Sequence, residues 1–165
     1  MHRLGPANDT LLVRTRREGV AARVGHDLVL EVTRWEATVE PDRIELTADT
    51  SSLAVREATG GVKPLSERDE GEIARNIAKV LRGAPVRFVS TSVSRVEGRL
   101  DVEGELTIGD ATRPLAARLD LDGDSVKGTV VVTQSAFGIT PYRGMLGALR
   151  LRDDVEVVVD ARWPG

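Results

Sequence analysis

Histidine is the side chain that acid and base catalysis uses most often, and this chain has two. His2 lies at the start of the sequence, where chain ends commonly fray, so His26 is the serious candidate. Its neighbour Asp27 resembles half of a dyad, but adjacent residues on a strand point to opposite faces of a sheet. We therefore assign no catalytic residue and expect His26 to fix the beginning of a strand. The alternative is a small enzyme in which His26 is the acid or base on a lipid-like substrate.

Acidic residues recur at alternate positions in the segment DLDGD at 120–124, as at the start of a calcium-binding loop. The pattern stops there, because Ser125 stands where such a loop requires glycine and Val131 where it requires glutamate. We interpret the segment as a solvated hairpin tip. Two histidines and no cysteine exclude three-histidine and thiolate zinc sites, so we expect no metal and no cofactor.

Composition is typical of one domain spanning 1–165, since 41% of the 165 residues are hydrophobic. The net charge of -3, with acids and bases interspersed, gives no basic stripe for nucleic acid and no polybasic membrane anchor. No stretch approaches the roughly 20 apolar residues of a membrane span, and MHRLGPANDT lacks the apolar run of a signal peptide. We therefore expect a cytoplasmic protein with no membrane span and no nucleic-acid partner.

Apolar and polar residues alternate through most of the chain with the period of two that half-buried strands show. The alternation is found at 11–15, 28–32, 35–39, 44–48, 86–90, 100–108, 115–121, 126–132 and 155–161. Between Val32 and Trp35 the apolar parity slips by one residue, which indicates a bend in a long strand. The sequence predicts an all-β fold, an antiparallel up-and-down barrel of about eight strands.

One segment has helical rather than strand periodicity. Four apolar residues fall on one face of a helix: Ile73, Ile77, Val80 and Leu81. Ser66 is placed to cap this helix, and Gly83 followed by Pro85 ends it, so we predict a helix at about 67–82. The preceding stretch, 54–64, has no periodicity and is expected to be a loop, either a plain connector or a lid over one barrel end.

The inward residues of the predicted barrel are mostly Val, Leu, Ala and Gly, which leave room for a cavity. A barrel of about eight strands is just wide enough to be filled by side chains or to hold one small ligand. An apolar cavity of order 300–1,000 Å³ would bury most of a long chain, and each methylene would contribute about 0.8 kcal/mol. The alternative is a filled barrel with a structural or interaction role. Strand parity predicts a ligand-binding lining of Leu30, Val32, Leu46, Phe88, Leu106, Val130 and Phe137, with His26, Tyr142 and Arg143 near an opening.

Four blocks of the sequence, in order, resemble the YceI-like family. They are GHDLVLEVTRWEATVE at 25–40, SSLAVREATG at 51–60 with the helix that ends before APVRFVSTSV, GELTIGDATRPL at 104–115, and QSAFGITPY at 134–142 with LRDDVEVVVDA. The resemblance implies a lipocalin-like barrel whose interior accepts an isoprenoid or fatty-acyl lipid, with no catalytic residues to carry over. Because such relatives tend to dimerise, it also implies a homodimer.

Overall fold

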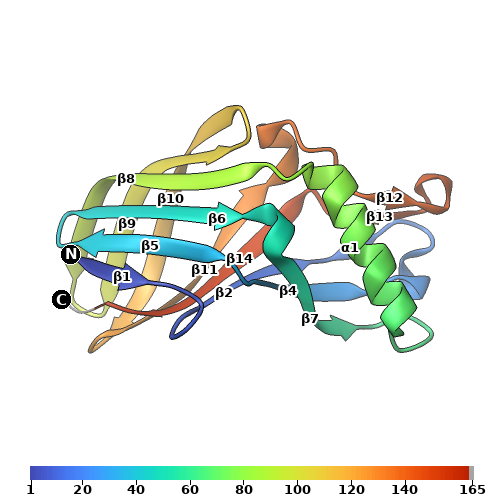
Figure 1. Cartoon of the computed structure of the whole chain (residues 1–165), viewed down its shortest axis with the longest axis horizontal. Coiled ribbons are helices and arrows are strands. Elements are labelled where there is room, and N and C mark those ends of the chain that lie inside the picture. Colours follow the sequence, from blue (N-terminus) through green and yellow to red (C-terminus); the bar gives the residue numbers. More distant parts are fainter. Residues whose placement is uncertain (164–165) are drawn as a thin grey trace.

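The computed structural model describes residues 1–163 and shows one long antiparallel sheet curled around itself (Figure 1). One α-helix, α1 (Glu67–Leu81), lies at the end of the molecule opposite both termini. The strands are β1 (His2–Leu4), β2 (Thr10–Thr15), β3 (Arg17–Glu18), β4 (Asp27–Val32), β5 (Trp35–Glu40), β6 (Arg43–Asp49), β7 (Leu53–Thr59), β8 (Pro85–Val96), β9 (Arg99–Ile108), β10 (Ala111–Asp122), β11 (Ser125–Thr133), β12 (Arg143–Gly144), β13 (Leu149–Leu151) and β14 (Asp154–Arg162).

The main sheet has 11 strands in the order β1-β5-β6-β8-β9-β10-β11-β14-β2-β4-β7, and β12, β13 and β3 form a small second sheet. Three pairs of these strands, β1 with β2, β4 with β5 and β6 with β7, are consecutive stretches separated by a short break. Counting each pair once reduces the 11 strands to eight. The ring is complete because β4 pairs with β2 while its continuation β5 pairs with β6. The predicted all-β antiparallel barrel is therefore confirmed, and the larger strand count reflects the breaks.

The predicted bend between Val32 and Trp35 is the break that separates β4 from β5. Both of these side chains are buried, so the chain keeps its apolar residues inside on each side of the bend. Ser52, at the facing break between β6 and β7, holds the two bends together. Its carbonyl accepts from the Thr33 hydroxyl at 2.7 Å, and its own hydroxyl accepts from the Arg34 amide at 3.0 Å.

The segment predicted as a loop at 54–64 is only partly a loop. Residues Leu53–Thr59 form β7, which pairs with β4 along its length. The prediction was wrong here because the register with β4 shifts at Arg56, so one alternation of apolar and polar residues does not run through the whole of β7. The loop proper begins at Gly60, whose φ of 80° favours glycine.

Helix α1 has the boundaries that its capping residues dictate. The Ser66 hydroxyl accepts from the Asp69 amide, and the Asp69 carboxylate accepts from the Ser66 amide, which completes a capping box. Arg82 ends the helix in the left-handed conformation, close to the predicted limit of 82. The helix lies beside β7 and the Thr50–Ser52 turn, at the end where the barrel opens (Figure 1).

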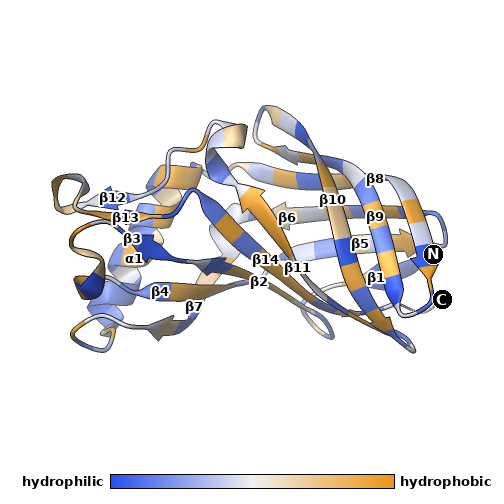
Figure 2. Cartoon of the chain, turned by 180° about the vertical axis from the view of Figure 1, so that it is seen from behind, coloured by the Kyte–Doolittle hydropathy of each residue, from blue (hydrophilic) through white to orange (hydrophobic). Residues whose placement is uncertain are grey.

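The alternation of apolar and polar residues is visible along β9, β10 and β11 in Figure 2. The apolar residues that point inward form a packed cluster near the end of the barrel where both termini lie. The buried members of this cluster are Val39, Leu100, Val102, Leu119, Leu121, Val126 and Trp163. From this cluster toward α1, the interior is hollow rather than filled.

We expect Leu100→Ala to lower the free energy of unfolding by about 2–5 kcal/mol, because it leaves a cavity in the packed cluster. Leu100 is only 1% exposed, whereas Val131 is 53% exposed on the outer face of β11. The matched control Val131→Ala should cost about 1 kcal/mol or less. Chemical denaturation measures both variants, and equal losses would contradict the assignment of this cluster as the core.

Candidate functional site

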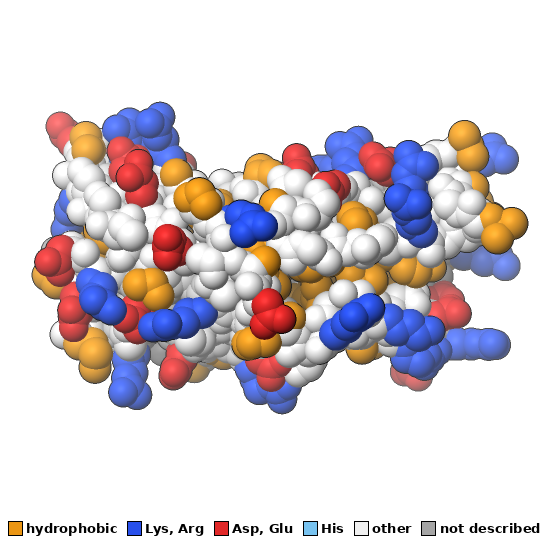
Figure 3. All heavy atoms as spheres, turned by 90° about the horizontal axis from the view of Figure 1, so that it is seen from above, with side chains coloured by type: hydrophobic (Ala, Val, Ile, Leu, Met, Phe, Trp, Pro, Cys, Tyr) orange, Lys and Arg blue, Asp and Glu red, His pale blue; other side chains and the backbone are white. Residues whose placement is uncertain are grey.

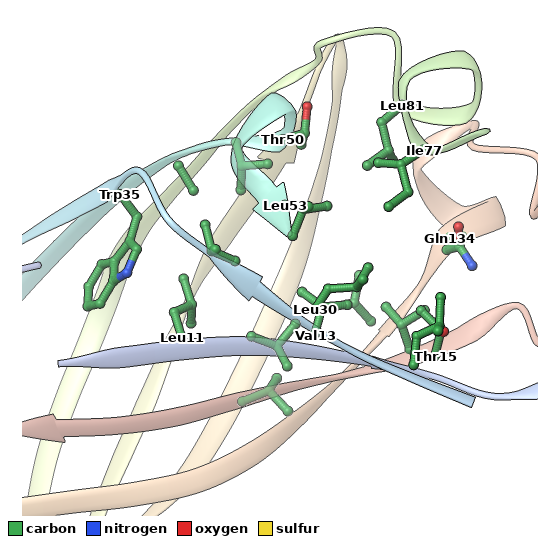
Figure 4. Close-up of a pocket in the computed structure, with 18 of the residues that line it drawn as sticks. Leu11, Val13, Thr15, Leu30, Trp35, Thr50, Leu53, Ile77, Leu81 and Gln134 are labelled. Carbon is green, nitrogen blue, oxygen red and sulfur yellow. The ribbon is translucent and has the colours of Figure 1, made fainter. Parts of the chain in front are cut away.

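The barrel encloses a cavity of about 760 Å³ that runs from the packed cluster to α1 (Figure 4). Its wall is made by inward side chains of the main sheet and by the apolar face of α1. The four helix residues that share this face in the sequence, Ile73, Ile77, Val80 and Leu81, all line the cavity. None of them is fully buried, since they face the hollow interior and not a packed core. The cavity is therefore an apolar chamber with one helical wall.

Most of the predicted lining residues do lie on this cavity. Leu30 and Val32 reach it from β4, Leu46 from β6 and Phe88 from β8. Leu106 and Val130 reach it from β9 and β11. Gly104 leaves room for the Phe88 ring beside β9, since a Cβ at residue 104 would come 2.6 Å from that ring. These side chains face one cavity, as strand parity predicted. Their role in binding stays a prediction.

Phe137 does not line the cavity but lies on a surface groove beside it, and Arg143, which was predicted near an opening, lies on the same groove next to α1. Strand parity holds only within a strand, and β11 ends at Thr133. Phe137 belongs to a 3₁₀ turn that follows this strand, so alternation no longer sets where its ring points. Gln134 and Ile139 line the cavity from this segment instead. The groove adjoins the cavity, because the two share Asn76, Val80, Leu81, Ile108, Ile139 and Tyr142.

His26 and Tyr142 do lie at the α1 end of the cavity, as predicted for residues near an opening. His26 Nε2 is 2.8 Å from the carbonyl oxygen of Lys63, in the loop before α1. Because a carbonyl can only accept, Nε2 is the donor in this hydrogen bond. The loop packs tightly here, since a Cβ on Gly61 would lie 2.5 Å from Nε2. His26 therefore ties the loop to the beginning of β4.

Asp27 pairs with Arg17 and not with His26. Its carboxylate accepts from the Arg17 amide at 2.8 Å and lies 3.7 Å from the Arg17 guanidinium. The same guanidinium donates to the Thr59 carbonyl at 2.9 Å, at the end of β7. Arg17 and His26 thus fasten the loop at 60–65 from two sides.

Within residues 1–163, three buried polar atoms on the cavity wall have no hydrogen-bond partner: Thr15 Oγ1, Trp35 Nε1 and Trp163 Nε1. All three are buried. An unpaired buried donor costs about 1–3 kcal/mol, which a ligand with an acceptor oxygen would offset. The Trp35 indole nitrogen faces the interior in Figure 4. The sequence analysis did not predict these residues as lining, although Trp35 is the first residue of the apolar alternation at 35–39 that follows the bend.

Asp69 lies on the cavity wall and has a lowered pKa, because its carboxylate accepts hydrogen bonds from the backbone amide and hydroxyl of Ser66.

No metal-binding geometry is found at the site or elsewhere in residues 1–163, because no three His, Asp or Glu side chains are grouped there to hold an ion. Nor does that part of the chain contain a helix long and apolar enough to cross a membrane.

We expect the first turn of α1 to loosen in acid. A carboxylate with a lowered folded-state pKa stabilises the fold above its ordinary value of 3.8, and this stability is lost as the pH falls through the folded-state pKa. The Asp69 and Glu70 amides, which donate to Ser66, should therefore lose protection from exchange as the pH falls below the ordinary carboxyl value of 3.8. In Asp69→Asn this pH dependence should be much smaller. Unchanged protection in the unmodified protein would contradict the capping role of the charge.

Comparison with known proteins gives one family match and several similar folds. A family model for the YceI-like domain matches residues 13–163. The crystal structure of Burkholderia cenocepacia BcnA is similar with a TM-score of 0.58 and 15% identity, covering 92% of this chain and 95% of that chain. The Campylobacter jejuni YCEI protein is similar with a TM-score of 0.52 and 11% identity, covering 84% and 83% of the two chains. A search of curated proteins finds no match. At these identities the two structures establish a shared fold alone.

Proposed function

This chain belongs to the YceI-like family, and from that premise we propose that it binds one long apolar or amphiphilic lipid, of polyisoprenoid or fatty-acyl type, inside the barrel. The observation that carries the proposal is the continuous apolar cavity of about 760 Å³. Its volume falls in the range of about 300–1,000 Å³ that small-molecule sites occupy. A hydrocarbon chain would gain about 0.8 kcal/mol for each methylene that it buries there.

The polar groups of the site favour an amphiphile over a plain hydrocarbon. Thr15 and Trp35 offer donors on the wall, and a ligand oxygen beside either would restore a hydrogen bond that the protein does not supply. His26, Lys63 and Tyr142 surround the α1 end, where a polar head group would meet water. The lipid would thus lie with its tail toward the packed cluster.

The two alternatives from the sequence receive less support. A filled structural barrel does not agree with a cavity of this size. An enzyme would need a second catalytic group beside His26, and its neighbour Asp27 pairs with Arg17 instead. We therefore assign His26 a part in fastening the loop and assign no catalytic residue. The cytoplasmic location and the homodimer stay predictions.

Native mass spectrometry of protein purified without detergent tests the proposal. A mass increment that disappears on extraction with organic solvent is expected, together with uptake of added prenyl or acyl lipids. Trp35 and Trp163 are the only tryptophans and both line the cavity, so their fluorescence should report this uptake. No bound lipid and no uptake would overturn the proposal.

We expect Val130→Phe to weaken lipid binding, while Val131→Phe on the adjacent outward position should not. Val130 lines the cavity and Val131 is exposed on the opposite face of β11. A phenyl group at residue 130 would exclude about two methylenes of the ligand, which lowers the affinity roughly tenfold. Tryptophan fluorescence titration with a fatty acid measures both variants. Equal affinities would show that the ligand does not occupy this part of the barrel.

A further inference from the structure

Four large hydrophobic side chains stand out from the loops at the α1 end of the barrel. Val20 is 95% exposed, Val62 70%, Met145 60% and Leu146 109%. Isolated exposed hydrophobics are ordinary, but a group of them at one site marks a surface that meets an apolar partner. Figure 3 shows hydrophobic side chains projecting at this end among lysines and arginines.

The three loops that carry these residues are fastened to one another. The Ala21 amide donates to the Ala148 carbonyl at 2.9 Å, which joins the loop of Val20 to the loop of Leu146. The Arg17 and His26 hydrogen bonds to the chain on either side of Val62 join the third loop. We call these segments, 16–26, 60–65 and 142–152, the rim. The rim surrounds the α1 end of the cavity, since each of its segments contributes lining residues.

Charge on the rim is strongly positive although the whole chain is acidic. The three rim segments contain seven Arg or Lys residues and one acid, Glu18, in a chain whose net charge is -3. Helix α1 and its cap at 82 beside the rim are balanced, with four acids and four bases. Ion pairs engage part of the positive charge: Arg16 with Glu156, Arg17 with Asp27, and Arg150 with Glu18. Within residues 1–163, four rim cations have no ion pair: Arg23, Lys63, Arg143 and Arg152.

Leu146 holds its exposed position at a conformational cost. Its φ of 56° and that of Met145, 50°, are left-handed, a region that costs a residue other than glycine about 1–2 kcal/mol. Leucine is normally buried and is rarely found in the left-handed region, but Leu146 is both exposed and left-handed. The combination is expected of a side chain whose partner lies outside the protein.

We propose that the rim docks on an anionic lipid bilayer, with its hydrophobic tips inserted and its cations against the lipid head groups, so that the cavity opens onto the membrane. Peripheral proteins bind such surfaces through an apolar contact together with basic residues, each worth about 1 kcal/mol near the surface. The rim has both features and directly adjoins a chamber suited to a lipid tail. Docking would let a lipid pass between bilayer and cavity with little exposure to water, a step that rests on the proposed lipid binding.

Sedimentation with phospholipid vesicles tests the docking. We expect binding to phosphatidylcholine vesicles that contain about 30% phosphatidylglycerol, and at least tenfold weaker binding to pure phosphatidylcholine. Added salt should weaken the first by screening. Equal binding to the two vesicle types, or none to either, would overturn the proposal.

Matched variants separate the rim from the rest of the surface. Arg23→Gln with Arg152→Gln should weaken vesicle binding about fivefold for each charge removed. Leu146→Asn should weaken it about tenfold, and asparagine tolerates the left-handed backbone, so the fold should persist. The controls are Arg3→Gln with Arg95→Gln near the opposite end, and Val131→Thr on the barrel wall. Controls that weaken binding as much as the rim variants would contradict the assignment.

Two further measurements distinguish docking on a membrane from lipid uptake into the cavity and from general binding of polyanions. Uptake of a soluble acyl ligand, followed by tryptophan fluorescence, can persist without vesicle binding, and that result would overturn the docking alone. Vesicle binding without any uptake would instead overturn the proposed lipid-binding function. Binding to duplex DNA as tight as to anionic vesicles, and unaffected by Leu146→Asn, would identify a general polyanion surface and overturn the lipid assignment.

Discussion

The site depends on one packing constraint, which is that the inward side chains of the barrel are too small to meet across it. Near the termini, Trp163 and the leucines of β9 and β10 fill the interior and give the sheet its core. Toward α1, the corresponding positions hold residues such as Val13, Val130 and Val157, and the space between them stays open. A protein interior normally packs as densely as an organic crystal, so an apolar chamber of this size is a departure that calls for an occupant.

The two bends at residues 33–34 and 50–52 explain how a closed sheet can also have an open end. Ser52 joins the bends, so β4 and β7 diverge from the direction of β5 and β6 while staying paired to each other. This divergence makes room for α1 between β7 and β8, and its apolar face completes the wall. The helix needs no buried core of its own, because its capping box and its place on the chamber hold it.

Much of the fold could be predicted from local sequence patterns, because alternation and capping act over a few residues. The period of two located nine strand segments, the slip before Trp35 located the bend, and Ser66 located the helix. The family match over 13–163 confirms the resemblance found in four blocks. Strand parity failed to place Phe137, which follows the end of its strand. The positive rim could not be predicted from the sequence for a different reason. Its cations lie on segments that are distant in the sequence, and only the fold brings them together.

The central claim is that lipid tails fill the chamber, and its most direct test is calorimetry of binding for a series of saturated fatty acids of increasing length. The binding free energy should become more favourable by about 0.8 kcal/mol for each added methylene, and it should level off once the chain fills the cavity. The heat-capacity change should become more negative over the same range, as expected for burial of apolar surface. An affinity that does not depend on chain length would contradict the account.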